Sequence, residues 1–377
     1  MEYVQLGDLI VAAKTNRCGD DDFPVLSITK SDGIVFQSEK FKKRIASKDT
    51  ADYKVVRRGQ LVQGIHIDEA NFGIQEVVDI GIVSPAYKIW DIKSNAIVPK
   101  YLEIILRSPR SIAYYASRFN GSIKRRERLT DKDFLQMKIP CPPLEEQTYA
   151  IELLNKATTL IEQRKQQLGE LDNLIKARFV ELFGDPKKNE KGWEKGIVSD
   201  YYNVKGGKRI PKGMGYADGI TNHPYLRATD MKNETIVDDD IHYIDEDVFQ
   251  HIKRYTVNAG DIYLTNVGVH LGMAGVIPEK YHGASLTENA VKLVPKTERV
   301  LTGKFLAYYI NSPGIQDYIN ERKMAVGVPK LAIFRIETMP LILPPMELQN
   351  QFTAFVEQVD KSKVVVQKAI SKFYPLI

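Results

Sequence analysis

The sequence predicts an α+β protein with two tandem mixed α/β domains, separated by two long helices that pair as an antiparallel coiled coil. Three observations predict this class: an internal repeat of about 200 residues, a long stretch of helical periodicity ending each repeat, and short apolar runs upstream of it that are bounded by Gly, Asp and Asn. The chain has 377 residues, too many for one ordinary core, which agrees with two or three domains.

The repeat consists of short matches that keep their order along the chain. Residues 142–147 read Pro-Pro-Leu-Glu-Glu-Gln and residues 344–349 read Pro-Pro-Met-Glu-Leu-Gln, at an offset of 202. Upstream, Lys-Tyr-Leu at 100–102 matches Lys-Phe-Leu at 304–306 at an offset of 204, so a two-residue insertion lies between. Ordered matches with slowly drifting offsets indicate a duplication, and the period is far longer than that of a solenoid.

These matches and the helix signals divide the chain into four segments. We predict a first domain over 1–143 with its helix over 144–184, and a second domain over 185–345 with its helix over 346–377. Each helix begins at a Pro-Pro pair with acidic residues in its first turn, where the helix dipole favours them. The first helix is expected to stop at Gly184, because glycine favours the left-handed backbone of a helix C-terminus.

Each long helix carries a narrow apolar seam with alternating steps of three and four residues, the pattern that pairs helices. A continuous first helix would be about 60 Å long at 1.5 Å per residue. The favoured partner is the other helix of the same chain, running antiparallel, and the alternative is that each helix packs only on its own domain. The residues predicted to pair the helices or dock other subunits are Leu154, Ile161, Leu168, Leu171 and Ile175 in the first helix and Phe352, Phe355, Val359, Val366 and Phe373 in the second.

The regions before the helices combine strand and helix signals. Residues 25–28 and 261–264 predict strands, whereas 101–115 and 304–319 each predict a single amphipathic helix that closes its domain. Residues 185–193, rich in Lys, Gly and Asp, predict a linker into the second repeat.

The sequence contains no recognisable catalytic constellation. It has no phosphate-binding P-loop, no Gly-x-Ser-x-Gly elbow, and no Asn/Asp-Pro-Pro-aromatic tetrad of the kind that amino-methylating enzymes place around a target base. The six histidines lack metal-ligand spacing, and the two cysteines form neither a disulfide framework nor a zinc quartet. We therefore expect no metal and no catalysis by this chain alone, in a reduced cytoplasmic setting. No apolar run reaches the ~20 residues needed to cross a bilayer.

Positive charge is concentrated in the first repeat. The formal net charge is +5, and residues 1–140 carry 23 Lys and Arg against 18 Asp and Glu. The first helix, at 141–184, carries 5 against 7. This distribution suits a domain that contacts a phosphate backbone and a helix that does not. For any single basic cluster, the alternative is an ordinary solvated face.

Basic clusters in both repeats are candidate phosphate contacts, and a few loop side chains have the donors and acceptors that base reading requires. In the second repeat the cluster lies in a Gly-rich loop, which lets backbone amides approach phosphates closely. The predicted DNA contacts are Lys42, Lys43, Arg44, Arg57, Arg58, Lys124, Arg125 and Arg126 in the first repeat, and Lys205, Lys208, Arg209, Arg227, Asn266, His270 and Lys330 in the second.

The chain resembles the specificity subunits of type I restriction-modification systems over essentially its whole length. The resemblance rests on residues 129–147, on the helix that runs to Arg-Phe-Val-Glu-Leu-Phe-Gly-Asp-Pro at 178–186, and on the second copy at 331–349. Residues 268–278 and the Ser-Leu-Thr-Glu-Asn at 285–289 are also similar to these proteins. The Pro-Pro-x-Glu-x-Gln helix start, present twice, is the most specific feature.

The resemblance implies a non-catalytic DNA-reading subunit. Each domain would be a target recognition domain that reads one half of a bipartite site in double-stranded DNA, while the helix pair sets the spacing and docks two modification subunits. Those subunits would carry S-adenosylmethionine and methylate adenine, and restriction subunits would add translocation and cleavage that use ATP and magnesium. The alternative, from another class, is an interaction scaffold whose helical hairpin joins proteins without DNA.

Overall fold

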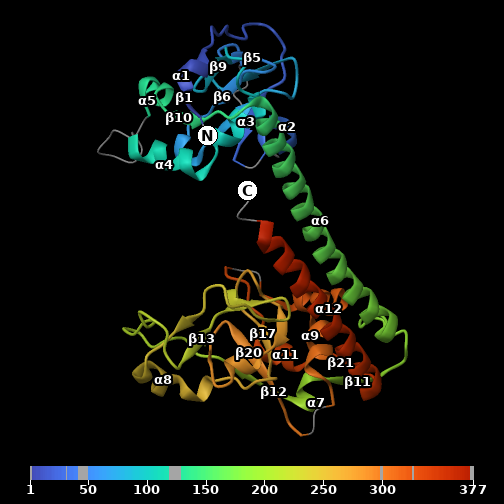
Figure 1. Cartoon of the computed structure of the whole chain (residues 1–377). Helices are drawn as coiled ribbons and strands as arrows, with labels where there is room; N and C mark the ends of the chain where they lie inside the picture. Colours follow the sequence, from blue (N-terminus) through green and yellow to red (C-terminus); the bar gives the residue numbers. More distant parts are fainter. Residues whose placement is uncertain are drawn as a thin grey trace. The chain divides into compact units, whose positions relative to one another are not determined.

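The computed structural model describes residues 2–30, 32–40, 50–118, 129–297, 300–324 and 327–373. These residues form two compact units, the first ending at Leu160 and the second beginning at Ile161. Each unit combines strands and helices (Figure 1), so the predicted α+β class is confirmed.

Unit 1 is built on an antiparallel sheet of four strands in the order β2-β9-β6-β7. These strands are β2 (Ile10–Ala12), β9 (Lys88–Ile92), β6 (Leu61–Gln63) and β7 (Phe72–Ile74). Three antiparallel pairs accompany the sheet: β1 (Tyr3–Gln5) with β10 (Lys138–Pro140), β3 (Leu26–Thr29) with β4 (Gly33–Phe36), and β5 (Lys54–Arg57) with β8 (Ile80–Val83). The helices are α1 (Leu6–Leu9), α2 (Gln37–Lys40), η1 (Ile67–Glu69), α3 (Pro99–Leu106), α4 (Pro109–Arg118) and α5 (Asp131–Leu135).

Aromatic side chains from three of these elements fill the core of unit 1. Phe72 of β7 stacks on Phe134 of α5 with 5.4 Å between ring centroids, and Trp90 of β9 lies at the same distance from Phe134. The indole N–H of Trp90 donates to Oε1 of Gln63 at 2.9 Å, so the one polar atom of this ring has a partner inside the core. The short helix α5 is thereby fixed against the sheet.

Unit 2 repeats this sheet strand for strand. Its order is β12-β20-β17-β18, again antiparallel throughout, and β11 pairs with β21 as β1 pairs with β10. The bounds are β11 (Glu194–Ile197), β12 (Tyr202–Gly206), β17 (Ile262–Thr265), β18 (Ala274–Val276), β20 (Ala290–Pro295) and β21 (Pro340–Leu343). The equivalent helices are α7 (Val198–Tyr201), α9 (Gly303–Asn311), α10 (Pro313–Arg322) and α11 (Ile333–Glu337). The duplication read from short sequence matches is therefore a duplication of architecture.

Unit 2 also contains a second sheet, of three short strands. Its middle strand β13 (Pro224–Leu226) pairs antiparallel with β16 (His242–Tyr243) and parallel with β19 (Ser285–Leu286). A small hairpin joins β14 (Met231–Lys232) to β15 (Thr235–Ile236). The remaining helices here are η3 (Ala228–Asp230), α8 (Glu246–Ile252), η4 (Lys253–Tyr255) and η5 (Glu279–Tyr281).

The prediction of one amphipathic helix over 101–115 and another over 304–319 is wrong, because each segment forms two helices. The breaks fall at Pro109 and Pro313, which begin α4 and α10. Ser312 before the second proline is extended, with φ −68° and ψ 149°. A residue that precedes proline is pushed out of the α region, whereas proline itself fits the first position of a helix.

The two long helices are α6 (Leu144–Phe183) and α12 (Met346–Phe373). Each is fastened to its own unit by one buried glutamine. Gln147 accepts from the Val98 amide at 2.8 Å and donates to the carbonyls of Ala96 and Pro142. The same three hydrogen bonds recur in unit 2, where Gln349 accepts from the Thr302 amide at 2.8 Å and donates to the carbonyls of Val300 and Pro344. This glutamine clasp explains why Pro-Pro-x-Glu-x-Gln occurs twice.

Within unit 2, the C-terminal half of α6 packs along α12 (Figure 1). Ile161, at the start of this half, clusters with Val366 near the end of α12. Further along α6, the Arg178 guanidinium lies 5.9 Å from the ring centroid of Phe355, which is nearer the start of α12. Rising numbers on one helix meet falling numbers on the other, so the two helices run antiparallel, as the seams predict.

The seam residues occupy this interface with one exception. Leu154 belongs to unit 1, where it is half-buried. Ile161, Ile175, Phe352, Val359 and Val366 are buried, while Leu168, Leu171, Phe355 and Phe373 pack against them partly buried.

Two buried phenylalanines at the end of α6 were not predicted as seam residues. Phe179 lies 5.5 Å from Phe352, and Phe183 lies 4.7 Å from Phe305 of α9, both between ring centroids. The end of α6 is thus part of the core of unit 2 as well as part of the helix pair.

Candidate nucleic-acid interface

Of the predicted DNA contacts of unit 1, only Arg57 and Arg58 lie within the described residues. Lys42, Lys43 and Arg44 lie outside the described residues, as do Lys124, Arg125 and Arg126. Arg57, at the end of β5, is exposed, and the Nε of its neighbour Arg58 forms an ion pair with Asp79 at 2.9 Å.

In unit 2, the Gly-rich loop after β12 is pressed against residues 286–290. The Gly207 amide donates to the Ala290 carbonyl at 3.1 Å, and the Lys208 amide donates to the Leu286 carbonyl at 2.8 Å. A Cβ on Gly207 would lie 1.9 Å from the Thr287 carbonyl oxygen, so only glycine fits this approach. The expectation that this loop offers amides to a phosphate is therefore wrong at these two residues, because both amides already bond to protein carbonyls.

The loop after β17 also contacts this segment. The Asn266 amide donates to the Asn289 carbonyl at 2.9 Å, and the Gly268 amide donates to the Pro329 carbonyl at 2.9 Å. A bridge between Val267 and Lys330 completes this contact. Residues 286–290 thus contact the loops after β12 and β17, and the loop after β17 contacts the segment before α11. These contacts place Lys208, Arg209 and Lys330 in one region of the unit.

Arg209 is already paired inside this region. Its Nε lies 2.6 Å from Oε1 of Glu288, and this hydrogen bond raises the pKa of the arginine. Burial raises the pKa of the Glu288 carboxyl, but the hydrogen bond from Arg209 and further hydrogen bonds outweigh burial and hold this pKa below its usual range. The Arg209 side chain is nevertheless 78% exposed, which leaves its outer N–H groups accessible to a phosphate. The Lys208 ammonium lies 5.7 Å from the centroid of the Tyr255 ring.

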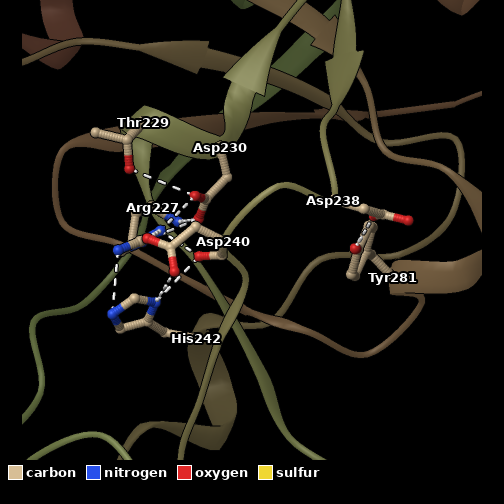
Figure 2. A network of polar contacts seen from close by, with 7 residues as sticks. All are labelled: Arg227, Thr229, Asp230, Asp238, Asp240, His242 and Tyr281. Carbon is tan, nitrogen blue, oxygen red and sulfur yellow. Dashed lines mark hydrogen bonds and ion pairs between the residues drawn. The ribbon is translucent and has the colours of Figure 1, made fainter. Parts of the chain in front are cut away.

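Arg227 is the centre of a separate polar network, which Figure 2 shows. Its Nη2 lies 2.8 Å from Oδ1 of buried Asp230 and 3.0 Å from Oδ2 of Asp240, while its Nη1 lies 3.2 Å from Nε2 of His242. The hydrogen bond to Asp230 is the main reason that the pKa of Arg227 is raised. Reciprocally, the hydrogen bond from Arg227 holds the pKa of Asp240 below its usual range.

This network ties together the chain between β13 and β16. A second tie lies nearby in Figure 2, where the hydroxyl of Tyr281 donates to Asp238. Hydrogen bonds from Lys280 and then from Tyr281 hold the pKa of the Asp238 carboxyl low. Because two carboxylates surround the Arg227 guanidinium and its side chain is only 21% exposed, its geometry favours bracing this segment over contacting DNA.

Asn266 is also placed unlike a base-reading residue. It is 5% exposed, and its Nδ2 donates to the Leu331 carbonyl at 3.3 Å. The side chain therefore joins the loop after β17 to the segment before α11 from inside the unit. Nothing in the sequence distinguished it from an exposed loop asparagine, since its burial depends on residues 65 positions away.

Four predicted contacts of unit 2 are exposed and form no ion pair with an acidic residue in the described part of the chain: Lys205 on β12, Lys208, His270 in the loop after β17, and Lys330. Two highly exposed apolar side chains flank them, Val269 at 90% and Val328 at 67%. Hydrogen-bond donors beside apolar side chains have the chemistry needed for phosphate oxygens and for thymine methyl groups.

No group of three His, Cys, Asp or Glu side chains among the described residues is arranged to hold a metal ion. Nor does any helix in that part combine the length and apolarity that a membrane span requires.

Comparison with known proteins identifies the family. Residues 190–372 match the family model described as the type I restriction modification DNA specificity domain. The specificity subunits of the type I restriction enzymes MjaVIII and MjaIX of Methanocaldococcus jannaschii are 22% and 23% identical to this chain, over 65% and 74% of its length. Residues 190–372 therefore belong to this specificity-domain family, and the chain as a whole is similar to type I specificity subunits. The resemblance stated from the sequence is confirmed.

The matched part of these relatives is less than two thirds of each, 62% of the MjaVIII subunit and 66% of the MjaIX subunit. The specificity subunit of the type I restriction enzyme EcoKI of Escherichia coli is 21% identical, with 62% of this chain and 53% of that subunit covered.

Solved structures extend the similarity of fold to the whole chain. A chain from a structure of complex assembly and conformational transition in the type I R-M system covers 100% of this chain, with a TM-score of 0.63 and 17% identity; 94% of that chain is covered. The type I S subunit from M. genitalium covers 99% with a TM-score of 0.50 and 13% identity, and 92% of it is covered. The chain therefore shares the overall fold of these solved chains.

Proposed function

We propose that this chain is the DNA sequence-recognition subunit of a type I restriction-modification complex. Each unit reads one half of a bipartite target in double-stranded DNA, and the helix pair sets the spacing between the halves. The observation that carries this proposal is one framework built twice, with the same sheet order and the same glutamine clasp but with different loops. Two readers on one chain match a target with two different halves.

Phosphate contacts would position each unit, and loop side chains would select bases. In unit 2, the exposed cations Lys205, Lys208, Arg209 and Lys330 are the proposed phosphate contacts, with His270 beside them. In unit 1, Arg57 and Arg58 remain proposed contacts, together with the two predicted clusters at 42–44 and 124–126. Arg227 and Asn266 are left out, because one is enclosed by carboxylates and the other is buried.

The chemistry of the complex would belong to other chains. We propose that two modification subunits dock along α6 and α12 and carry S-adenosylmethionine, and that restriction subunits bring ATP and magnesium. Exposed leucines on α6, such as Leu153 and Leu174, leave apolar surface for such partners. This chain would not catalyse a reaction by itself and would work on DNA in the cytoplasm.

The deciding experiment maps adenine methylation across the DNA of cells that express the neighbouring modification genes with or without this chain. We expect a split motif that is methylated only when this chain is present. A single uninterrupted motif, or methylation that does not depend on the chain, would contradict the proposal. Absence of any motif, with the modification subunits confirmed by mass spectrometry, would favour the scaffold alternative, which should also show no salt-dependent DNA binding.

A further inference from the structure

Unit 1 contains a hollow that the candidate interface does not include. It has a volume of about 430 Å³ and lies between β1, α4 and the turn that leads into β10. Its lining is Gln5, Arg110, Tyr114, Arg118, Gln136, Met137 and Lys138. Three of these seven side chains are cations, and none is acidic, so the hollow concentrates positive charge.

The two arginines of the hollow are held in place without a carboxylate partner. The Arg110 guanidinium lies 4.7 Å from the ring centroid of Tyr3 and donates to the Tyr3 hydroxyl at 2.5 Å. The Arg118 guanidinium lies 5.7 Å from the centroid of Tyr114. Within the described ranges, Arg110, Arg118 and Lys138 form no ion pair with Asp or Glu. Contact with a ring fixes a guanidinium but leaves its charge and most of its N–H groups available to an anion.

Unit 2 provides an internal control, because its equivalent elements form an equivalent hollow. Tyr318 and Arg322 of α10 occupy the places of Tyr114 and Arg118, at the offset of 204. The tyrosine has the same structural role in both copies: Tyr114 donates to the Asp133 carbonyl at 2.8 Å and Tyr318 donates to the Arg335 carbonyl at 3.0 Å. The Arg322 guanidinium lies 3.9 Å from the Tyr318 ring centroid, as Arg118 lies over Tyr114, so the arginine–tyrosine contact is part of the shared framework.

The hollow of unit 2 also has three cations in its lining, Lys187, Lys195 and Arg322, but two of them are at other positions. Gly314 and Pro340 stand in unit 2 where unit 1 has Arg110 and Lys138. The hollow of unit 2 is smaller, at about 210 Å³, and its lining includes Glu321. Glu321 pairs with Arg322 at 3.0 Å, and Lys187 lies 3.8 Å from the same carboxylate. Two of the three cations in the unit 2 hollow are thus paired with a carboxylate, and the framework does not require cations at the positions of Arg110 and Lys138.

We propose that the hollow of unit 1 is a phosphate-binding site and that its ligand is a phosphodiester of the DNA backbone. Two guanidinium groups and an ammonium around one space can give a phosphate several charge-assisted hydrogen bonds. The oxygens of a phosphate can accept hydrogen bonds from more of these donors than the two oxygens of a single carboxylate can. The assignment to DNA rests on the proposed function of the chain, whereas the assignment to phosphate rests on the hollow itself.

The test compares two double variants in the complex purified with its modification subunits. In the first, Arg110→Gln and Lys138→Gln remove the two cations that only unit 1 has, and Arg118 stays on its tyrosine. The matched control changes Lys187→Gln and Arg322→Gln in unit 2. DNA affinity is measured against salt concentration on the methylation target and on unrelated DNA. We expect the first variant to lower the affinity for both DNAs by the same factor. The slope of log affinity against log salt should decrease in magnitude by about 1. The control should keep the slope of the unaltered complex.

An unchanged slope in the first variant would overturn the assignment to a DNA phosphate. Titration of the DNA-free complex with inorganic phosphate then separates the sources: binding that the first variant loses, with the DNA slope intact, assigns the hollow to a free phosphate compound. Loss of the modification subunits from the variant complex would instead indicate a carboxylate of a partner and overturn the proposal. If the unaltered complex shows no salt-dependent DNA binding, the proposed function fails, and the phosphate titration still decides whether the hollow binds phosphate. Equal unfolding midpoints for all forms exclude misfolding as the cause.

Discussion

The two units of this chain share a framework and differ in what they attach to it. The sheets have the same strand order, and Gln147 and Gln349 make the same three hydrogen bonds at the start of α6 and α12. The hollow beside α4 carries uncompensated cations, whereas the equivalent hollow beside α10 contains a carboxylate. Residues that hold the domain to its helix have been kept, while surface charge has diverged.

This difference suits two readers with separate targets. A common framework keeps each helix at a defined position on its own unit, because the buried clasp leaves the helix start little freedom. Under the proposed function, divergent surfaces would change which DNA is bound without disturbing that position. The same contrast shows which substitutions should act equally in both units and which should act in one.

The largest expected effect comes from lengthening α6 at the boundary between the units. Four residues inserted after Leu160 should add about 6 Å of helix and leave the pairing of 161–183 with α12 intact. Since base pairs are about 3.4 Å apart, we expect the gap between half-sites to grow by about two base pairs while both half-sites stay the same. Methylation mapping measures the outcome.

A matched control for this lengthening is a four-residue insertion at Gly219, whose surroundings are open. It should leave the gap unchanged. If the insertion after Leu160 changes the sequence of a half-site and leaves the gap alone, α6 does not set the spacing.

The next largest effect is expected at the glutamine clasp, where substitution should lower the stability of either unit by a similar amount. Gln147→Ala and Gln349→Ala should each destabilise their own unit by about 2–3 kcal/mol, because each leaves buried backbone groups without partners. Unit 1 contains Trp90 and unit 2 contains Trp193, so denaturant unfolding followed by fluorescence, in chains with the other tryptophan changed to Phe, reports each unit separately.

Gln351→Ala is the control for the clasp, since Gln351 is exposed on α12, and it should change stability little. A loss confined to one of the two clasp variants would show that the shared hydrogen bonds are not equally important in the two units.

The smallest effect is a loss of stability that is expected in unit 2 only, at Gly207. Gly207→Ala should cost about 1–3 kcal/mol, because the new methyl group meets the Thr287 carbonyl and the loop must shift. Val204 of β12 and Ala12 of β2 occupy the same position in the two sheets. Gly207 lies three residues after Val204, and the residue three after Ala12 is the exposed Thr15. Thr15→Ala should stay within about 0.5 kcal/mol of the unaltered chain.

Urea unfolding of the two variants measures both costs. Equal costs for Gly207→Ala and Thr15→Ala would mean that the close approach in unit 2 carries no energetic weight.

The sequence determined the features that repeat in a regular way. Matches at offsets of 202 and 204 gave the duplication, and seams with steps of three and four gave the helix pair, because periodicity along the chain translates directly into one face of a helix. Pro109 and Pro313 also marked helix breaks in the sequence, and the prediction of single helices there overlooked the restriction that proline places on the preceding residue.

Only the tertiary structure decided how individual polar and charged side chains are used. Arg227 resembled a free cation until Asp230 and Asp240 were placed beside it, and Asn266 resembled an exposed loop residue until Leu331 was placed against it. Arg110 and Lys138 were isolated cations in the sequence and form one hollow in the fold. The physical reason is that the effect of a charge depends on the groups within a few ångströms of it, and only the fold decides which groups, near or distant along the chain, lie there.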